Sequence, residues 1–282
     1  MFVASTVVRN TASKFASAPL SAQFGMVVIT LYIIAAVFAP QLAPYGEAQI
    51  VGSQFEPWSS AYWLGTDNLG RDMFTRLLFG ARNTIGIAFM TTVLAFSIGS
   101  TCGLVAATFG GWTDQLLSRL VDVLMSIPQL IFALLLLSIF GTSTISLVLI
   151  IAVLDSTRVF RLSRAVAVNA AVSDYVEAAR LRGEGPVWIM SREILPNILP
   201  TLIAEFGLRF CFVFLLISGL SFLGLGIQPP TSDWGSMVRD SATLIVYADI
   251  TPLLPAAAIA LLAVAVNLVV DWFLHTASGL KD

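Results

Sequence analysis

Few side chains in this sequence could take part in chemistry. Among its 282 residues there are one histidine, His275, and two cysteines, Cys102 and Cys211. One imidazole cannot assemble a metal centre alone, and both cysteines lie in apolar runs, where we expect them to act as small hydrophobic residues. No G-x-x-x-x-G-K-[ST] phosphate loop occurs. We therefore expect no catalytic residue, no metal site and no cofactor bound by this chain.

Two charges deep inside an apolar run are the most informative polar residues. Glu205 and Arg209 fall in the stretch 198–223, about 10 and 16 Å into a helix that begins at Ile198. Exposing either charge to lipid would cost on the order of 3 kcal/mol, and their i,i+4 spacing with Glu first favours an ion pair. Two interpretations stay open. The pair lines a solute path or holds a gate, or it only neutralises charge within the membrane.

A second i,i+4 pair, Asp271 and His275, lies near the end of the last apolar run. A satisfied polar helix end is favoured over a proton relay, because one histidine near an interface needs no special role.

The elements that hold these residues must be membrane helices. Hydrophobic residues make up 57% of the chain and charged residues only 11%, with a mean hydropathy of +0.88. A soluble domain carries roughly a quarter charged residues, whereas a surface that faces lipid needs none. The net charge of −2 gives no footprint for nucleic-acid binding. We expect an all-α integral membrane protein.

Six apolar stretches have about the 20 residues that cross a hydrocarbon core. We expect the first to be a retained helix and not a signal peptide, because Pro40 follows Ala39, the plausible cleavage residue. Pro128 should kink the third. Five charges in the third and fourth are expected near their cytoplasmic ends, with Asp155 pairing with Arg158. The stretches are 24–42, 84–109, 116–140, 145–166, 198–223 and 253–274.

The Lys/Arg distribution places both termini in the cytoplasm. The predicted order is a cytoplasmic segment 1–23, a first span 24–42, an extracytoplasmic segment 43–83, a five-helix core 84–275 that includes the cytoplasmic loop 167–197, and a cytoplasmic tail 276–282.

Turn-forming residues mark two outer segments. Residues 65–72 should form a tight turn stabilised by Asp and Asn side chains, since the spacing lacks the ligand pattern of a calcium loop. In the outer loop 227–252, Pro229-Pro230 and Trp234-Gly235 predict an ordered turn with an aromatic ring at the membrane interface.

The cytoplasmic loop carries a pattern with a functional meaning. It contains Asp174-Tyr175-Val176-Glu177-Ala178-Ala179-Arg180-Leu181-Arg182-Gly183 and, further on, Ile194-Leu195-Pro196-Asn197. The spacing predicts a short alanine-containing helix ended by glycine, a second short helix over 186–193, and then a membrane span. Two short helices joined at a glycine make a compact knob, and the alanines permit close approach by another protein.

This pattern resembles the "EAA" motif of importer-type ATP-binding-cassette permeases. The resemblance implies the type I importer permease fold, with the loop as a coupling helix that docks on a cytoplasmic ATPase. Glu193 departs from the motif, which has an apolar residue there. The positions that the resemblance assigns to ATPase coupling are Asp174, Glu177, Ala178, Ala179, Arg180, Gly183, Leu195 and Pro196.

The resemblance extends over most of the chain from about Pro40 onward. The segments 63–72, 76–82 and 221–226 and the outer Pro-Pro and Trp-Gly pairs are similar to the C-type permease of the dipeptide/oligopeptide/nickel family. It implies a bacterial inner-membrane heterodimer with a second permease, two ATPase subunits that carry ATP and Mg, and an extracytoplasmic solute-binding protein. The implied cargo is a peptide or similarly sized solute, with nickel chelates and glutathione-like or opine-like conjugates left open.

Two other classes are weighed. An ion-gradient-driven secondary transporter often shows inverted repeats and broken helices, and neither is evident in the sequence. An intramembrane enzyme would need a nucleophile beside histidine or paired aspartates. His275 lies far from any such cluster, and the surroundings of Asp155 and Asp271 do not resemble such a protease.

Overall fold

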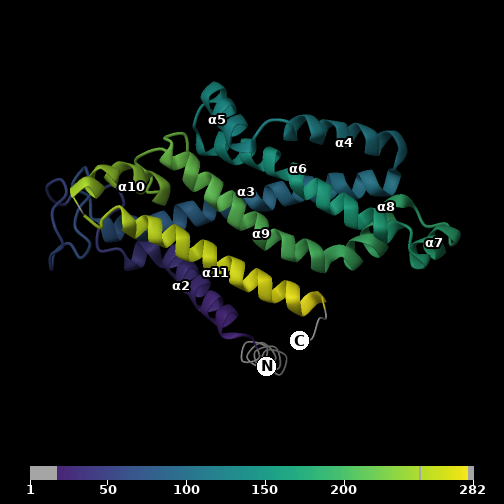
Figure 1. Cartoon of the computed structure of the whole chain (residues 1–282), viewed down its shortest axis with the longest axis horizontal. Helices are drawn as coiled ribbons and strands as arrows, with labels where there is room; N and C mark the ends of the chain where they lie inside the picture. Colours follow the sequence, from purple (N-terminus) through teal and green to yellow (C-terminus); the bar gives the residue numbers. More distant parts are fainter. Residues whose placement is uncertain (1–17, 248, 279–282) are drawn as a thin grey trace.

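The computed structural model of the protein describes residues 18–247 and 249–278. These residues form an elongated helical bundle (Figure 1). The predicted cytoplasmic segment 1–23 and tail 276–282 lie largely outside these residues. The long helices run along the long axis, with α10 near one end and α7 and α8 at the other. The helices are α2 (Leu20–Leu42), α3 (Met73–Phe109), α4 (Gly111–Met125), α5 (Gln129–Phe140), α6 (Thr144–Ala171), α7 (Asp174–Leu181), α8 (Pro186–Ile189), the π-helical turn η1 (Met190–Ile194), α9 (Leu195–Phe222), α10 (Trp234–Ser241), the 3₁₀ turn η2 (Ala242–Tyr247) and α11 (Leu253–Ser278).

Four helical stretches among the described residues are long and apolar enough to cross a membrane. They are α2, α3, the continuous stretch Pro186–Phe222 and α11. The consecutive helices α4 and α5 would add a fifth if they form one span. The remaining helix, α6, has 28 residues but carries several charges. The all-helical membrane fold is therefore confirmed, and the count of six spans stays a prediction.

The third predicted span is broken and not merely kinked. Helices α4 and α5 meet at an angle of 86° across the break at Ser126–Pro128. Pro128 disfavours helical backbone at the preceding residue, so Ile127 leaves the helix. At the end of α4, the hydroxyl of Ser126 donates to the carbonyl of Val123 at 2.7 Å. The expectations of one continuous helix over 116–140 and of a chain without broken helices were both wrong.

Helix α4 explains how several membrane charges are satisfied. Its Asp114 pairs with Arg164 of α6, and its Asp122 lies 2.7 Å from Arg161. The other side of α4 exposes an apolar stripe, consisting of Trp112, Leu116, Leu120 and Val123. These two arginines of α6 are thus compensated by carboxylates of the neighbouring helix α4.

Small residues bring α3 and α6 together. A Cβ atom on Gly99 would lie 2.5 Å from the carbonyl oxygen of Ser156, and one on Gly103 would lie 2.8 Å from Cβ of Ser163. Because the backbones approach so closely, a larger side chain at either glycine would force the helices apart.

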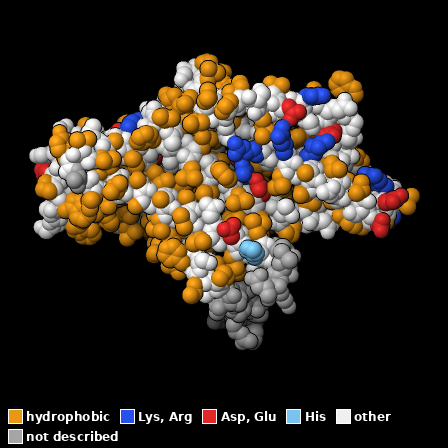
Figure 2. All heavy atoms as spheres, viewed as in Figure 1, with side chains coloured by type: hydrophobic (Ala, Val, Ile, Leu, Met, Phe, Trp, Pro, Cys, Tyr) orange, Lys and Arg blue, Asp and Glu red, His pale blue; other side chains and the backbone are white. Residues whose placement is uncertain are grey.

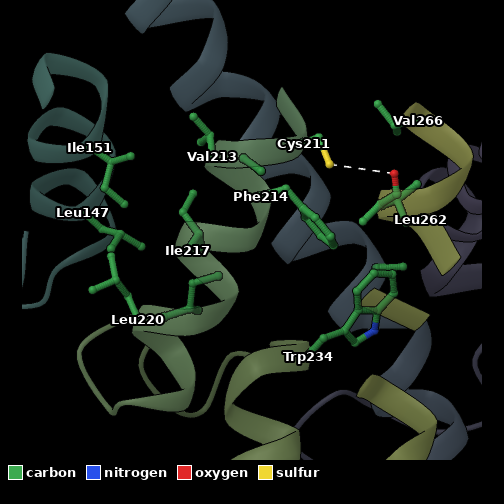
Figure 3. Packing of buried hydrophobic residues seen from close by; sticks show 14 of the residues in the cluster. Leu147, Ile151, Cys211, Val213, Phe214, Ile217, Leu220, Trp234, Leu262 and Val266 are labelled. Carbon is green, nitrogen blue, oxygen red and sulfur yellow. Dashed lines mark hydrogen bonds between the residues drawn. The ribbon is translucent and has the colours of Figure 1, made fainter. Parts of the chain in front are cut away.

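One hydrophobic core cluster is built around α9 and Trp234 (Figure 3). Trp234 is only 2% exposed. Its indole N–H donates to the carbonyl of Leu77 at 3.0 Å, and Gly80 leaves room for the ring. The expectation of an interfacial aromatic was wrong, because a hydrogen-bond partner inside the bundle makes full burial possible. Cys211 is buried in the same cluster, as expected for a small hydrophobic residue.

The outer segment before α3 forms the predicted turn. The carboxylate of Asp67 accepts from the backbone N–H groups of Leu69 and Arg71 at 2.8 and 2.9 Å and pairs with the side chains of Arg71 and Arg76. Asp72 caps α3 by accepting from Thr75 N at 2.8 Å. This segment therefore fixes the outer end of α3.

The last outer loop is tied to α3 through Asp233. The Asp233 carboxylate is fully buried and accepts from the hydroxyl of Thr84 and from Ser236 N, both at 2.9 Å. Burial raises the pKa of this carboxyl above its usual value.

Candidate functional site

The loop between α6 and α9 folds into an elbow, which we define as residues 174–194. Val176 and Ala179, three residues apart on α7, are fully buried against Ile189 and Ile194. The i,i+3 spacing puts them on one face of the helix. Ala179, which the resemblance assigned to ATPase coupling, therefore packs inside the chain and is not available to a partner. The remaining coupling positions on α7 are exposed, namely Asp174, Glu177, Ala178 and Arg180. The elbow is thus anchored by one face and presents the other.

Gly183 reverses the chain between the two short helices. Its φ of +84° lies in the left-handed region that favours glycine. Gly183 N donates to Arg180 O at 2.9 Å, and Glu184 N donates to Ala179 O at 3.2 Å. This pair of bonds is the Schellman arrangement that ends a helix, so the glycine is needed for backbone conformation.

The second short helix is not separate from the membrane span. Helix α8, the turn η1 and α9 form one continuous helical stretch, Pro186–Phe222, where the sequence predicted a break. Pro196 has no N–H for the usual bond to the fourth preceding carbonyl, and a π-helical turn is one way to accommodate such a residue. Leu195 is half-buried there and Pro196 is exposed. The elbow is therefore directly continuous with α9.

The departure at Glu193 has a local explanation. Glu193 lies 3.4 Å from Arg182, and its backbone carbonyl accepts from the side chain of Asn197 at 2.6 Å. The guanidinium of Arg182 also lies 6.0 Å from the centre of the Trp188 ring. A half-buried carboxylate is tolerated here because a basic partner on the α7 side compensates it.

Apolar side chains are unusually exposed around the elbow. Leu181 is 84% exposed and Val172 is 81% exposed, and Val187 and Trp188 are also accessible. Exposed apolar residues that surround a small, rigid projection are typical of a surface that meets another protein.

The predicted pair Glu205 and Arg209 forms, and it gains a third member. Arg209 Nε lies 2.7 Å from Glu205 Oε1 as an ion pair without well-directed hydrogen-bond geometry. Arg209 Nη1 lies 3.9 Å from Asp155 Oδ1 of α6. The side chains of Arg209, Glu205 and Asp155 are 11, 18 and 1% exposed. We call these three residues the charge triad.

Asp155 was missed as a site residue because the sequence suggested Arg158 as its partner near the cytoplasmic end. The sequence nevertheless contained a signal from which the contact between Asp155 and Arg209 could have been predicted. Asp155 lies 11 residues after Thr144, and Arg209 lies 11 residues after Ile198. Each is therefore about 16 Å along its helix, and the two helices run in opposite directions. Both positions fall near the middle of a core about 30 Å thick, so opposite charges on the two helices could have been matched by depth.

The charged side chains form a distinct feature of one face of the molecule. Figure 2 shows Lys/Arg and Asp/Glu side chains gathered in the middle of that face and toward the elbow, among mostly apolar surface. Asp271 and His275 are exposed near the end of α11 and are not members of the triad.

The chain matches two family models. Residues 99–276, more than half of the chain, match the binding-protein-dependent transport system inner membrane component. Residues 21–57 match the N-terminal transmembrane domain of oligopeptide transport permease C.

Curated relatives cover nearly the whole chain. A dipeptide transport system permease protein of Alkalihalophilus pseudofirmus is 34% identical over 92% of this chain and 83% of its own length. A glutathione transport system permease protein of Pectobacterium atrosepticum is 33% identical over 90% and 83%. A di/tripeptide transport system permease protein of Pseudomonas aeruginosa is 34% identical over 92% and 85%. The chain therefore belongs to the family of binding-protein-dependent transport system inner membrane components, the membrane permease subunits of ATP-binding-cassette importers.

Proposed function

We propose that this chain and a second, different permease subunit form the path by which peptides or similarly sized solutes cross the bacterial inner membrane. Two ATPase subunits that carry ATP and Mg dock on the cytoplasmic side, and an extracytoplasmic solute-binding protein delivers the cargo. Both termini lie in the cytoplasm. Relatives named for dipeptides, di/tripeptides and glutathione support a small peptide-like cargo.

The anchored elbow is the observation that carries this proposal. Val176 and Ala179 fix α7 from beneath, so that Glu177, Ala178 and the exposed Leu181 are available to a partner. Ala178 occupies the exposed side without bulk, which allows the backbone of α7 to come close to the wall of a groove. We assign ATPase docking to this face, with Gly183 holding its shape and with Leu195 and Pro196 joining it to α9.

Continuity between the elbow and α9 suggests how docking is used. Because Pro186–Phe222 is one helical stretch, a displacement of the elbow on ATP binding would be carried into the membrane. An ATPase that binds one conformation more tightly than another shifts the balance between inward-open and outward-open states. The charge triad lies on this helix, and we propose that it lines or gates the solute path between α6 and α9.

The test is the substitution Ala178→Trp, with Ala178→Ser as the matched control. Ala178 is exposed, so both variants should insert and fold. The indole should block close approach, and we expect loss of ATPase co-purification and of solute uptake in Ala178→Trp alone. A double variant, Glu177→Lys with Gly183→Pro, should lose both activities as well while the protein stays in the membrane.

The measurements are membrane abundance, ATPase co-purification and uptake of radiolabelled dipeptide by cells. Normal co-purification and uptake in Ala178→Trp would contradict the docking assignment. If Ala178→Ser lost the ATPase as well, the loss could not be attributed to the size of the new side chain. That outcome would also contradict the docking assignment.

A further inference from the structure

A large apolar groove lies between apolar helices of the chain, and no member of the charge triad lines it. Its volume is about 730 Å³, within the range of small-molecule sites. Its walls come from α2, α3, α9 and α11, which all belong to stretches apolar enough to cross a membrane. The lining is aliphatic and aromatic and includes Tyr32, Phe89, Phe206 and Phe210, with one charged exception, Arg82.

Arg82 lies at the outer end of the groove. Arg82 lies on α3, two residues before the predicted second span 84–109, and we therefore place it at the boundary between headgroups and hydrocarbon. Within the described residues its guanidinium makes no ion pair or hydrogen bond. The nearby carboxylates are already engaged, since Asp67 pairs with Arg71 and Arg76 and Glu47 accepts from Asn83 and Ser232. A guanidinium at this depth favours a phosphate, which it can bind through two parallel hydrogen bonds.

The groove extends through about two thirds of one leaflet, whose hydrocarbon half is about 15 Å thick. Below Arg82 it continues past Ile85, Gly86 and Phe89 on α3, about 10 Å along the helix. It ends where Phe206 packs edge-on against Phe89 and Phe96, with ring centres 5.9 and 5.3 Å apart. A helix of a partner subunit would cross both leaflets and is about 10 Å wide. An acyl chain of the outer leaflet needs only the depth from the headgroup to this aromatic floor.

We propose that this groove binds one anionic phospholipid, with its phosphate on Arg82 and an acyl chain between α2, α3, α9 and α11. The single uncompensated cation favours a headgroup of net negative charge over a zwitterionic one. A lipid held here would brace α2 against the core helices, because the groove walls include Ile29 and Ile33 of α2 as well as Leu262 of α11.

Two substitutions test the two ends of the site. Arg82→Met removes the phosphate contact. Gly86→Phe fills the groove, because a Cβ atom on Gly86 meets nothing within 4 Å. The matched controls are Arg119→Met, an exposed arginine on α4 that does not line the groove, and Gly219→Phe, where a Cβ also meets nothing within 4 Å.

The experiment is native mass spectrometry of the full chain, purified with its transporter partners and stripped of lipid in detergent. The complex is titrated with phosphatidylglycerol, phosphatidylethanolamine and inorganic phosphate. We expect one tight phosphatidylglycerol site that Arg82→Met and Gly86→Phe weaken about tenfold or more, as for loss of a charge-assisted contact or of apolar burial. The two controls should change affinity by no more than about twofold.

Unchanged lipid affinity in Arg82→Met would overturn the proposal. Equally tight binding of inorganic phosphate would also overturn it, because it would indicate a simple anion site. Lipid binding only after removal of the partner permease would overturn it as well, because it would indicate that a partner helix fills the groove. Because transport is not measured, the outcome is independent of whether the elbow docks an ATPase.

Discussion

Removal of the central cation from the charge triad should have a large effect on stability. In Arg209→Met the carboxylates of Glu205 and Asp155, only 18 and 1% exposed, would remain near the middle of the bundle without their cation. Removing one partner from a buried ion pair costs about 3–5 kcal/mol, because the remaining charge is desolvated and uncompensated. At roughly 2–4 °C per kcal/mol for a domain of comparable size, we expect the melting temperature in detergent to fall by on the order of 10 °C.

A neutral triple variant separates the two interpretations of the triad. Asp155→Asn, Glu205→Gln and Arg209→Met together remove every charge while keeping the side-chain volumes similar. Replacing a buried ion pair or triad by uncharged residues of similar volume is often neutral or stabilising, so the melting temperature should recover. If the charges only neutralise each other, peptide uptake should recover with it. If they line the solute path or hold a gate, as we propose, uptake should stay impaired in a stable, fully assembled complex.

Fluorescence-detected thermal unfolding and uptake of radiolabelled dipeptide measure the two properties on the same preparations. Full recovery of both in the triple variant would refute a transport role for the triad. A melting temperature of Arg209→Met equal to that of the unmodified protein would refute the energetic reasoning, since it would mean that the two carboxylates are solvated or protonated at no cost.

Two further predictions concern packing and pH. Gly99→Ala or Gly103→Ala should destabilise the protein by about 1–3 kcal/mol, because the new Cβ atom overpacks the contact between α3 and α6. The control Gly86→Ala lies in open space and should be neutral or stabilising by up to about 1 kcal/mol. Equal melting temperatures for all three variants would contradict the close approach of α3 and α6. Burial is the chief cause of the raised pKa of Asp233, so the folded protein favours the protonated carboxyl. The stability that this carboxyl contributes is fully present below the ordinary Asp pKa of about 3.9 and is lost as the pH rises through the folded-state pKa. Asp233→Asn keeps a good helix cap and should gain melting temperature relative to the unmodified protein as the pH rises, and a gain on lowering the pH would contradict this.

Local signals allowed much of the candidate site to be predicted. The pairing of Glu205 with Arg209 follows from i,i+4 geometry on one helix. The turn around Asp67 follows from side-chain hydrogen bonds within a few residues. In each case the interacting groups are close in sequence, so that propensity and helical period are sufficient.

The features that escaped prediction depend on contacts between distant segments. Asp155 pairs with Arg209 across α6 and α9, and the burial of Trp234 requires a carbonyl on α3 and the space left by Gly80. Pro128 signals a disturbance of the helix, but nothing local distinguishes a shallow kink from the 86° break. Apolar length alone also cannot decide whether α6, with its charges compensated by α4, crosses the membrane.

The continuity of α9 with the elbow gives the weak contact in the charge triad a mechanical meaning. Helix α6 is fixed to α3 by the close approach at Gly99 and Gly103, whereas α9 begins in the elbow that we assign to the ATPase. Any displacement of α9 relative to α6 would therefore change the contacts between these two helices. There Arg209 and Asp155 lie 3.9 Å apart, beyond hydrogen-bond distance. A shift of about 1.5 Å, one residue's rise along a helix, is enough to close this contact or to break it, whereas Glu205 moves with Arg209 on the same helix.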